Sequence, residues 1–200
     1  MLEDRPIVEP ATRADWRAWL AERHATERGA WVVYRKRKHA GPDDIDYEAI
    51  VLEALCFGWI DSTSGRVDEE RTRLYVAPRK LGSIWAATNK ARLERLEAEG
   101  LVAPAGRAVV DQAKADGSWT TLDAAEAGTE PPDLVEALAR DDLARAHWDA
   151  FPASTRKMAI GWISVAKRPQ TRAARVEAVV VSAAANDRTI GQRPAGDSRA

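Results

Sequence analysis

Two charged residues, Asp61 and Arg79, stand where a ligand-binding site can form. Asp61 directly follows the apolar residues Gly58, Trp59 and Ile60 in the stretch CFGWIDSTSG, and Arg79 follows the alternating stretch RTRLYVAP. A carboxylate accepts hydrogen bonds, and a guanidinium offers a planar pair of donors that matches a carboxylate or a phosphate. A rigid aromatic segment before Asp61 fixes the position of the carboxylate, which recognition of a ligand requires.

The charged residues around Asp61 and Arg79 admit two interpretations. They form exposed cross-strand ion pairs worth about 0.2–1 kcal/mol each, or they line a pocket. The pocket interpretation is supported by residues 78–80, which lead to a helix predicted to begin at Ser83, because the free N–H groups of a helix N-terminus favour an anion. The charged and polar residues concerned are Asp61, Arg66, Asp68, Arg71, Tyr75, Arg79 and Lys80.

The predicted helix from Ser83 adds an indole and an amide to this region. Trp85 and Asn89 are four residues apart and share a helix face, so together they suit an uncharged polar ligand. The alternatives are core packing for Trp85 and a solvent-facing role for Asn89. The complete predicted ligand-binding set is Trp31, Lys36, Trp59, Asp61, Arg66, Tyr75, Arg79, Lys80, Ser83, Trp85 and Asn89.

A second group of basic residues lies near the C-terminal end. Thr171 is predicted to cap the last helix, and Arg172 and Arg175 are three residues apart on one helix face. Phosphate, nucleic acid or an acidic surface can dock there, and a merely solvated face is the alternative. This basic helical patch comprises Lys167, Arg168, Arg172 and Arg175, beside Trp162.

The sequence predicts no catalytic residue, no metal site and no cofactor. The histidines His24, His39 and His147 are far apart, and the motifs HExxH, CxxC, GxGxxG and GxSxG are absent from the sequence. Cys56 lies in an apolar run and is interpreted as a buried thiol. A hydrolase-like enzyme that uses Asp61 and Arg79 remains an alternative.

Hydrophobic periodicity predicts an α+β module over residues 1–119, with an N-terminal antiparallel sheet and packed helices. A capping box at Thr12 and Asp15 begins the first helix. The other expected elements are a strand at 31–34, a helix capped by Asp46 and ended by Gly58, strands at 59–62 and 71–76 with a turn or bulge at 64–65, a helix from Ser83 to Gly100, and a helix near 106–115.

The rest of the chain is expected to form a small all-helical module. Residues 120–132 end in paired prolines and are predicted to be a linker. Helices are expected within residues 133–185, beginning near Asp133, Asp141, Ser154 and Pro169, and residues 186–200 are predicted to be a disordered tail.

Composition bounds the class of protein. The 30 Lys and Arg residues nearly balance the 31 Asp and Glu residues, so no global field directs the chain to nucleic acid or anionic lipid. The acidic N-terminal segment lacks the pattern of a signal peptide, and no stretch approaches the about 20 apolar residues of a membrane span. We therefore expect a cytoplasmic protein without membrane insertion.

Five blocks of the sequence resemble the YdeI/OmpD-associated, or bacteriocin-protection, family. The resemblance implies a role in bacterial stress or antimicrobial-peptide resistance and supplies no catalytic residues. The blocks are Trp31 with Tyr34 and Lys36, ALCFGWID at 54–61, YVAPRK at 75–80, SIWAATNKARLERL at 83–96 and AKRPQTRAARV at 166–176.

The leading hypothesis is therefore a non-catalytic binding protein that recognises a small anionic or polar ligand, or a peptide. The alternatives are the hydrolase-like enzyme and a weak nucleic-acid binder that uses residues 35–38 and 168–175. The sequence does not indicate an oligomeric state.

Overall fold

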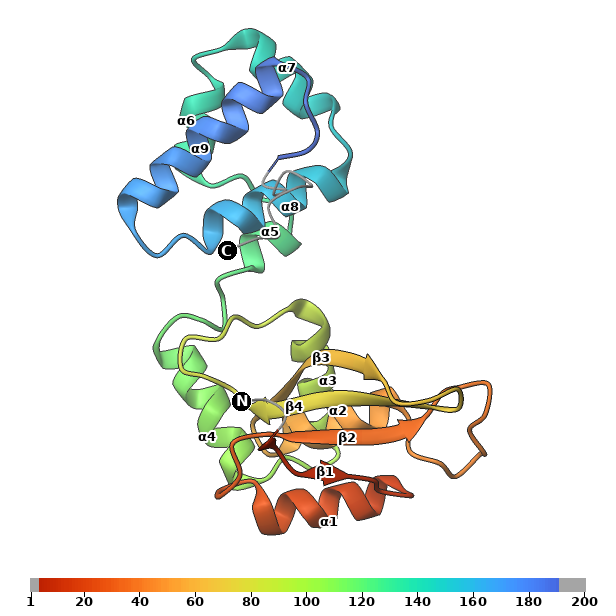
Figure 1. Ribbon diagram of the computed structural model, residues 1–200. Coiled ribbons are helices and arrows are strands. Elements are labelled where there is room, and N and C mark those ends of the chain that lie inside the picture. Colours follow the sequence, from red (N-terminus) through yellow and green to blue (C-terminus); the bar gives the residue numbers. More distant parts are fainter. Residues whose placement is uncertain (1–3, 191–200) are drawn as a thin grey trace. The chain divides into compact units, whose positions relative to one another are not determined.

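The computed structural model describes residues 4–190, and the chain divides into two compact units. The first unit is Met1–Trp119 and the second is Thr120–Ala200 (Figure 1). Each unit has its own cluster of buried hydrophobic residues. The predicted α+β class, with a helical C-terminal region, is confirmed.

The sheet of the first unit has the strand order β1-β2-β4-β3. β1 (Ile7–Val8) pairs in parallel with β2 (Ala30–Arg35). β4 (Arg71–Pro78) pairs antiparallel with both β2 and β3 (Trp59–Arg66). The sheet is thus mixed, because β1 adds a parallel pair to the predicted antiparallel strands.

Alternate residues of each strand face opposite sides of the sheet. Val32 and Leu74 belong to the core that the helices cover, whereas their neighbours Trp31 and Tyr75 lie on the other face. A register shift between Asp61 and Ser64 marks the irregularity expected near residue 64, and β3 continues past it.

Among the described residues, four helices complete the first unit, and α2 lies against one face of the sheet with α3 packed on α2 (Figure 1). Thr12 and Asp15 form the predicted capping box, and Asp46 accepts a hydrogen bond of 2.8 Å from the Ala49 amide at the start of α2. The helices are α1 (Arg13–Arg23), α2 (Tyr47–Cys56), α3 (Ala87–Ala98) and α4 (Pro104–Ala115).

A buried carboxylate joins α1 to α2. Glu53 is 2% exposed and accepts hydrogen bonds from Arg13 at 2.5 Å and from Arg17 at 2.6 Å. Arg17 also donates to the carbonyl of Leu101, at 2.8 Å, just before α4. A carboxylate removed from water requires compensating donors. The donors of Glu53 come from α1, and Arg17 in turn links α1 to the segment before α4.

α4 packs closely against the end of α2. A Cβ atom at Gly106 would lie 2.2 Å from the carbonyl oxygen of Cys56, and the Ala103 amide donates to the same oxygen at 3.0 Å. This close approach requires glycine and fixes the position of α4.

The second unit consists of helices around a core that includes Leu134, Trp148 and Ile160. Asp141 caps α7 as predicted, through a 2.9 Å bond from the Ala144 amide. The helices are α5 (Asp123–Glu126), α6 (Pro132–Leu138), α7 (Asp142–Ala150), α8 (Ala153–Ser164) and α9 (Pro169–Ala184).

The predicted cap at Thr171 is wrong, and the expected helix starts Asp133 and Ser154 lie in the first turns of α6 and α8. The N-cap residues of α6, α8 and α9 are Pro131, Pro152 and Arg168, and none of them makes a side-chain capping bond. Proline lies in the first turn of α6 and α9, where its fixed φ suits a helix start. Thr171 therefore lies inside α9.

Two segments outside the predicted helical module are also part of the second unit. Residues 120–132 contain α5, and Ala125 is buried in the second core. Ile190, at the C-terminal end of the described region, is 2% exposed in that core. The remainder of the predicted tail, residues 191–200, lies outside the described residues.

Candidate functional site

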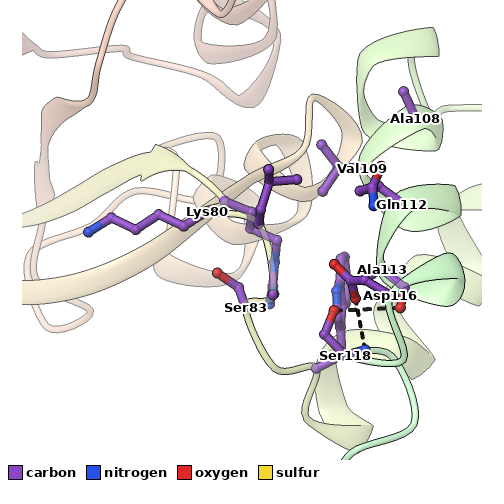
Figure 2. Close-up of a pocket in the computed structure, with 12 residues that line it drawn as sticks. Lys80, Ser83, Ala108, Val109, Gln112, Ala113, Asp116 and Ser118 are labelled. Carbon is purple, nitrogen blue, oxygen red and sulfur yellow. Dashed lines mark hydrogen bonds between the residues drawn. The ribbon is translucent and has the colours of Figure 1, made fainter. Parts of the chain in front are cut away.

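A pocket of about 200 Å³ opens between the loop after β4 and helix α4. The loop contributes Arg79 through Ser83 and then Trp85, and Figure 2 shows Val109 and Gln112 of α4 among the residues that line the pocket. Most of the surface is apolar. The lining residues are Arg79, Lys80, Leu81, Gly82, Ser83, Trp85, Ala108, Val109, Gln112, Ala113, Asp116 and Ser118.

Arg79 is the central cation of this pocket. Its guanidinium carbon lies 3.7 Å from the ring centroid of Trp85, a cation–π contact, and Nη1 donates to the carbonyl of Ile84 at 3.3 Å. Nε is buried without a hydrogen-bond partner, and Arg79 forms no ion pair with any residue between 4 and 190. Burial lowers the pKa of Arg79 to about 10, although the charge of Asp61 acts in the opposite direction.

The positions of Arg79 and Trp85 follow from packing at the end of β4. The Arg79 amide donates to the carbonyl of Gly58 at 3.0 Å, which extends the pairing of β4 beyond Pro78. Trp85 is 1% exposed and contacts Trp119, with 4.9 Å between ring centroids. The buried indole thus presents a fixed face to the guanidinium.

Asp116 fastens the loop to the end of α4. Its carboxylate accepts a 2.9 Å hydrogen bond from the Ser118 amide. Hydrogen bonds from Ser118, from the Gly82 backbone and from Gln112 lower the pKa of Asp116 below its usual range. Gly82 has φ +69°, a left-handed conformation that glycine adopts without strain.

The prediction of a helix N-terminus at Ser83 is wrong. α3 begins at Ala87, and its N-cap Ala86 makes no side-chain hydrogen bond. Ser83 lies in the loop, where its amide donates to the carbonyl of Lys80 at 3.0 Å. The apolar spacing misled the prediction because Trp85 is buried from a loop rather than from a helix face. The ligand site therefore has no helix N-terminus at Ser83.

The matches to known protein families divide along the two units. Residues 8–109 match "Domain of unknown function (DUF8412)", and residues 128–186 match "Bacteriocin-protection, YdeI or OmpD-Associated". The chain therefore belongs to the DUF8412 family, whose model covers about half of it, and residues 128–186 carry a bacteriocin-protection, YdeI or OmpD-associated domain. No curated protein and no solved structure matches the chain.

The pocket lies outside the segment that matches the bacteriocin-protection, YdeI or OmpD-associated family. Arg79 through Val109 belong to the DUF8412 match, which covers about half of the chain. Gln112, Asp116 and Ser118 fall between the two matched segments. Of the five resembling blocks, only AKRPQTRAARV lies inside residues 128–186.

Asp61 belongs to a polar cluster on the edge of the sheet rather than to the pocket lining. It pairs with Val76 in the register of β3 and β4, and its carboxylate accepts a 2.8 Å hydrogen bond from Tyr47. Burial, together with this hydrogen bond, raises the pKa of Tyr47 to about 12. Asp61 is thus already bound to a donor from α2.

Asn89 lies in the same neighbourhood, on α3. Its side-chain oxygen accepts a 2.9 Å hydrogen bond from Arg92, which also binds the carboxylate of Glu48 through bonds of 2.9 and 2.5 Å. This ion pair lowers the pKa of Glu48. The predicted face shared by Trp85 and Asn89 does not exist, since Trp85 precedes the helix.

Three of the predicted aromatic residues are buried structural residues. Trp59 is 1% exposed, and its indole donates to the carbonyl of His24 at 3.3 Å. Trp31 and Tyr75 contact each other on the other face of the sheet, with 5.2 Å between ring centroids, and Arg73 lies 4.2 Å from the Trp31 ring centroid.

The predicted cations Lys36 and Arg66 stabilise the turn between β3 and β4. Lys36 donates to the carbonyls of Asp68 and Glu69 at 2.7 and 3.0 Å, and Arg66 donates to that of Asp68 at 3.2 Å. Of the predicted set, the structure therefore brings together Arg79, Lys80, Ser83 and Trp85. Figure 2 shows the Lys80 side chain extending away from α4.

The basic helical patch is partly neutralised. Arg172 binds Asp133 through two hydrogen bonds of 2.6 and 2.8 Å, and Arg175 donates to the carbonyl of Trp162 while its guanidinium lies 5.0 Å from that ring centroid. Lys167 and Arg168 are exposed between α8 and α9.

Within residues 4–190, no group of three or more His, Cys, Asp and Glu side chains is arranged to hold a metal ion. Across the same residues, no helix combines the length and apolar character needed to traverse a bilayer.

Proposed function

We propose that this family member binds a small molecule with an apolar body and one anionic group in the pocket between the β4–α3 loop and α4. The observation that supports the proposal is the state of Arg79. Its cation is partly withdrawn from water against an indole and forms no ion pair with a described residue, although the charge of Asp61 reaches it.

Withdrawal of a charge from water is costly unless a counter-charge compensates for it. The pKa of Arg79, lowered by burial to about 10, expresses this cost. A carboxylate ligand would supply the missing charge, and a guanidinium binds a carboxylate through two parallel hydrogen bonds. Ligand binding would then offset the desolvation free energy of the Arg79 cation, which the unliganded protein leaves uncompensated.

Size and lining restrict the class of ligand. A pocket of about 200 Å³ is smaller than the about 300–1,000 Å³ of sites for drug-sized molecules. Leu81, Ala108, Val109 and Ala113 provide apolar surface beside Trp85. We therefore favour a small monocarboxylate, bound in the service of the bacteriocin protection that the description of the domain at residues 128–186 names.

The two alternative functions have less support. A hydrolase would need Asp61 and Arg79 to face one substrate, but Asp61 binds Tyr47 and is not among the residues that line the pocket. A nucleic-acid binder would need free cations. Arg172 is paired with Asp133, and Lys36 binds backbone carbonyls.

Pairs of ligands that differ only in charge provide the test. Acetate, hexanoate and benzoate, each compared with its neutral amide, would be titrated into the protein while tryptophan fluorescence and the melting temperature are measured. A ligand at 100 times its Kd stabilises the folded protein by about 2.7 kcal/mol, which is measurable as a rise in Tm. The variant Arg79→Gln removes the cation, and Arg107→Gln on the exposed side of α4 makes the same charge change outside the pocket.

We expect hexanoate or benzoate to bind at least tenfold more tightly than its amide, and Arg79→Gln to abolish this difference. Arg107→Gln should retain it. Equal binding of acid and amide, or an undiminished preference for the acid in Arg79→Gln, would contradict the proposal.

A further inference from the structure

A second hollow lies in the helical unit, in the segment that carries the family match. It measures about 520 Å³ and is formed by facing sides of α6 and α9, together with Arg140 just after α6. The residues of this α6–α9 groove are Asp133, Glu136, Ala137, Arg140, Pro169, Arg172, Ala173, Val176, Glu177 and Val180.

The groove is elongated, because its residues recur at helical spacing. On α9 the lining positions are three or four residues apart, or adjacent, from Pro169 to Val180, and eleven residues at 1.5 Å each give about 16 Å of length. This corresponds to about three turns of a helix laid along α9. On the other wall, the lining positions from Asp133 to Arg140 follow the same three- and four-residue spacing.

The apolar part of the groove consists of small or β-branched side chains. Ala137 on α6 faces a strip of α9 formed by Ala173, Val176 and Val180. Such short side chains permit a third helix to approach closely, since the distance between helix axes depends on the side chains at the contact. A groove between two helices is a recurrent site for the apolar face of an amphipathic helix.

The charged residues on the rim of the α6–α9 groove indicate the sign of the charge that a partner would carry. Asp133 and Arg172 neutralise each other through a bidentate pair. Glu136 and Arg140 are 4.0 Å apart and 73% and 79% exposed, so water screens their attraction. Glu177 forms no ion pair with any described residue. Three acids and two bases thus leave one uncompensated negative charge along the groove.

We propose that the α6–α9 groove binds a short amphipathic helical peptide segment that carries lysine or arginine beside its apolar face. Small apolar residues of the peptide pack on Ala173, Val176 and Val180, and a basic residue lies next to Glu177. The groove belongs to the second unit, so this proposal is independent of the ligand pocket in the first.

A synthetic helical peptide of fourteen residues, composed of leucine, alanine and lysine with all lysines on one face and a fluorescent label, serves as the probe. Its controls are a scrambled peptide of equal composition and a version with glutamate in place of lysine. Fluorescence anisotropy of each peptide would be recorded with the full chain. Ala173→Gln places a larger, uncharged polar side chain in the groove, whereas Ala174→Gln makes the same change one residue away on α9, outside the lining.

We expect the lysine peptide to bind at least tenfold more tightly than either control peptide. Ala173→Gln should weaken its binding at least tenfold, and Ala174→Gln less than twofold. Circular dichroism would verify that both variants remain folded.

Glu177→Lys reverses the charge at an exposed position, and Glu94→Lys on α3 is its matched control in the first unit. The first change should weaken the lysine peptide at least threefold and strengthen the glutamate peptide, and the second should do neither. Equal binding of the scrambled peptide, or binding unaffected by Ala173→Gln, would overturn the proposal. Self-association in analytical ultracentrifugation that Ala173→Gln abolishes would assign the groove to a second copy of the chain instead.

Discussion

Burial affects two charged side chains of the first unit in opposite ways. Glu53 is almost inaccessible and is matched by Arg13 and Arg17. Arg79 is partly withdrawn from water against Trp85 and forms no ion pair with a described residue, although the charge of Asp61 reaches it. The first arrangement supports the fold, and under our proposal the second leaves a cation available to a ligand. Loss of the Glu53 carboxylate should therefore lower the free energy of unfolding.

Replacement of Glu53 by Gln should lower the free energy of unfolding by about 3 kcal/mol, because it breaks a buried ion pair and leaves two guanidinium groups without their counter-charge. Glu22→Gln removes an exposed ion pair with Arg23 and should cost less than about 1 kcal/mol. Urea denaturation would measure both. Similar losses in the two variants would contradict the structural role assigned to Glu53.

The lowered pKa of Arg79 predicts how carboxylate binding depends on pH. Burial lowers this pKa to about 10, so the folded protein holds the cation below pH 10 and loses it above. The affinity for the carboxylate should therefore be constant from about pH 7 to 9 and fall about tenfold per pH unit above 10. The neutral amide should show no such decline in isothermal titration calorimetry, and a carboxylate affinity that stays constant to pH 11 in folded protein would contradict the lowered pKa of Arg79.

At the scale of the elements, two helical glycines have different surroundings. Gly106 faces the backbone of Cys56 at the α2–α4 contact, whereas a Cβ atom at Gly161 on α8 would meet Ala125 and Leu122 at an ordinary 3.7 Å. Helix propensity favours alanine at both positions. If alanine destabilises the protein at Gly106 but stabilises it at Gly161, the difference should therefore come from packing alone.

Gly106→Ala should destabilise the first unit by about 1–3 kcal/mol or more, since backbone cannot yield as a side chain does. It should also weaken ligand binding, because α4 forms one wall of the pocket. Gly161→Ala should stabilise the second unit by about 0.5–1 kcal/mol. Chemical denaturation monitored by circular dichroism tests both changes, and a stable Gly106→Ala variant with unchanged ligand affinity would show that the close approach is not required.

Local signals in the sequence predicted most elements of the first unit but not the geometry of the pocket. Thr12 with Asp15, and Asp46, mark helix starts through bonds made within a few residues, so they are readable from sequence. The apolar spacing around Trp85 is typical of a helix, so the sequence predicted one there. Trp85 is instead buried from a loop against Trp119, a contact between distant residues that the sequence does not show. Gln112, Asp116 and Ser118 were missed for the same reason, since only the folded chain brings them to the loop.

At the scale of the whole molecule, the described residues 4–190 form two cores, and each unit carries one of the two binding features that we propose. We propose a small anion for the pocket of the first unit and a basic peptide for the groove of the second. The opposite charge preferences give the two proposals separate tests. We expect saturation of the pocket with benzoate to leave the affinity of the groove for the lysine peptide unchanged.

The central claim is that Arg79 receives an anion, and its side-chain signal in ¹⁵N–¹H NMR tests this most directly. The Nε resonance, assigned by its absence from the Arg79→Lys variant, should move progressively as benzoate or hexanoate is added and should saturate with the Kd measured by calorimetry. It should remain in place when the neutral amide is added. A carboxylate that binds the protein while the Arg79 resonance stays fixed would contradict the account.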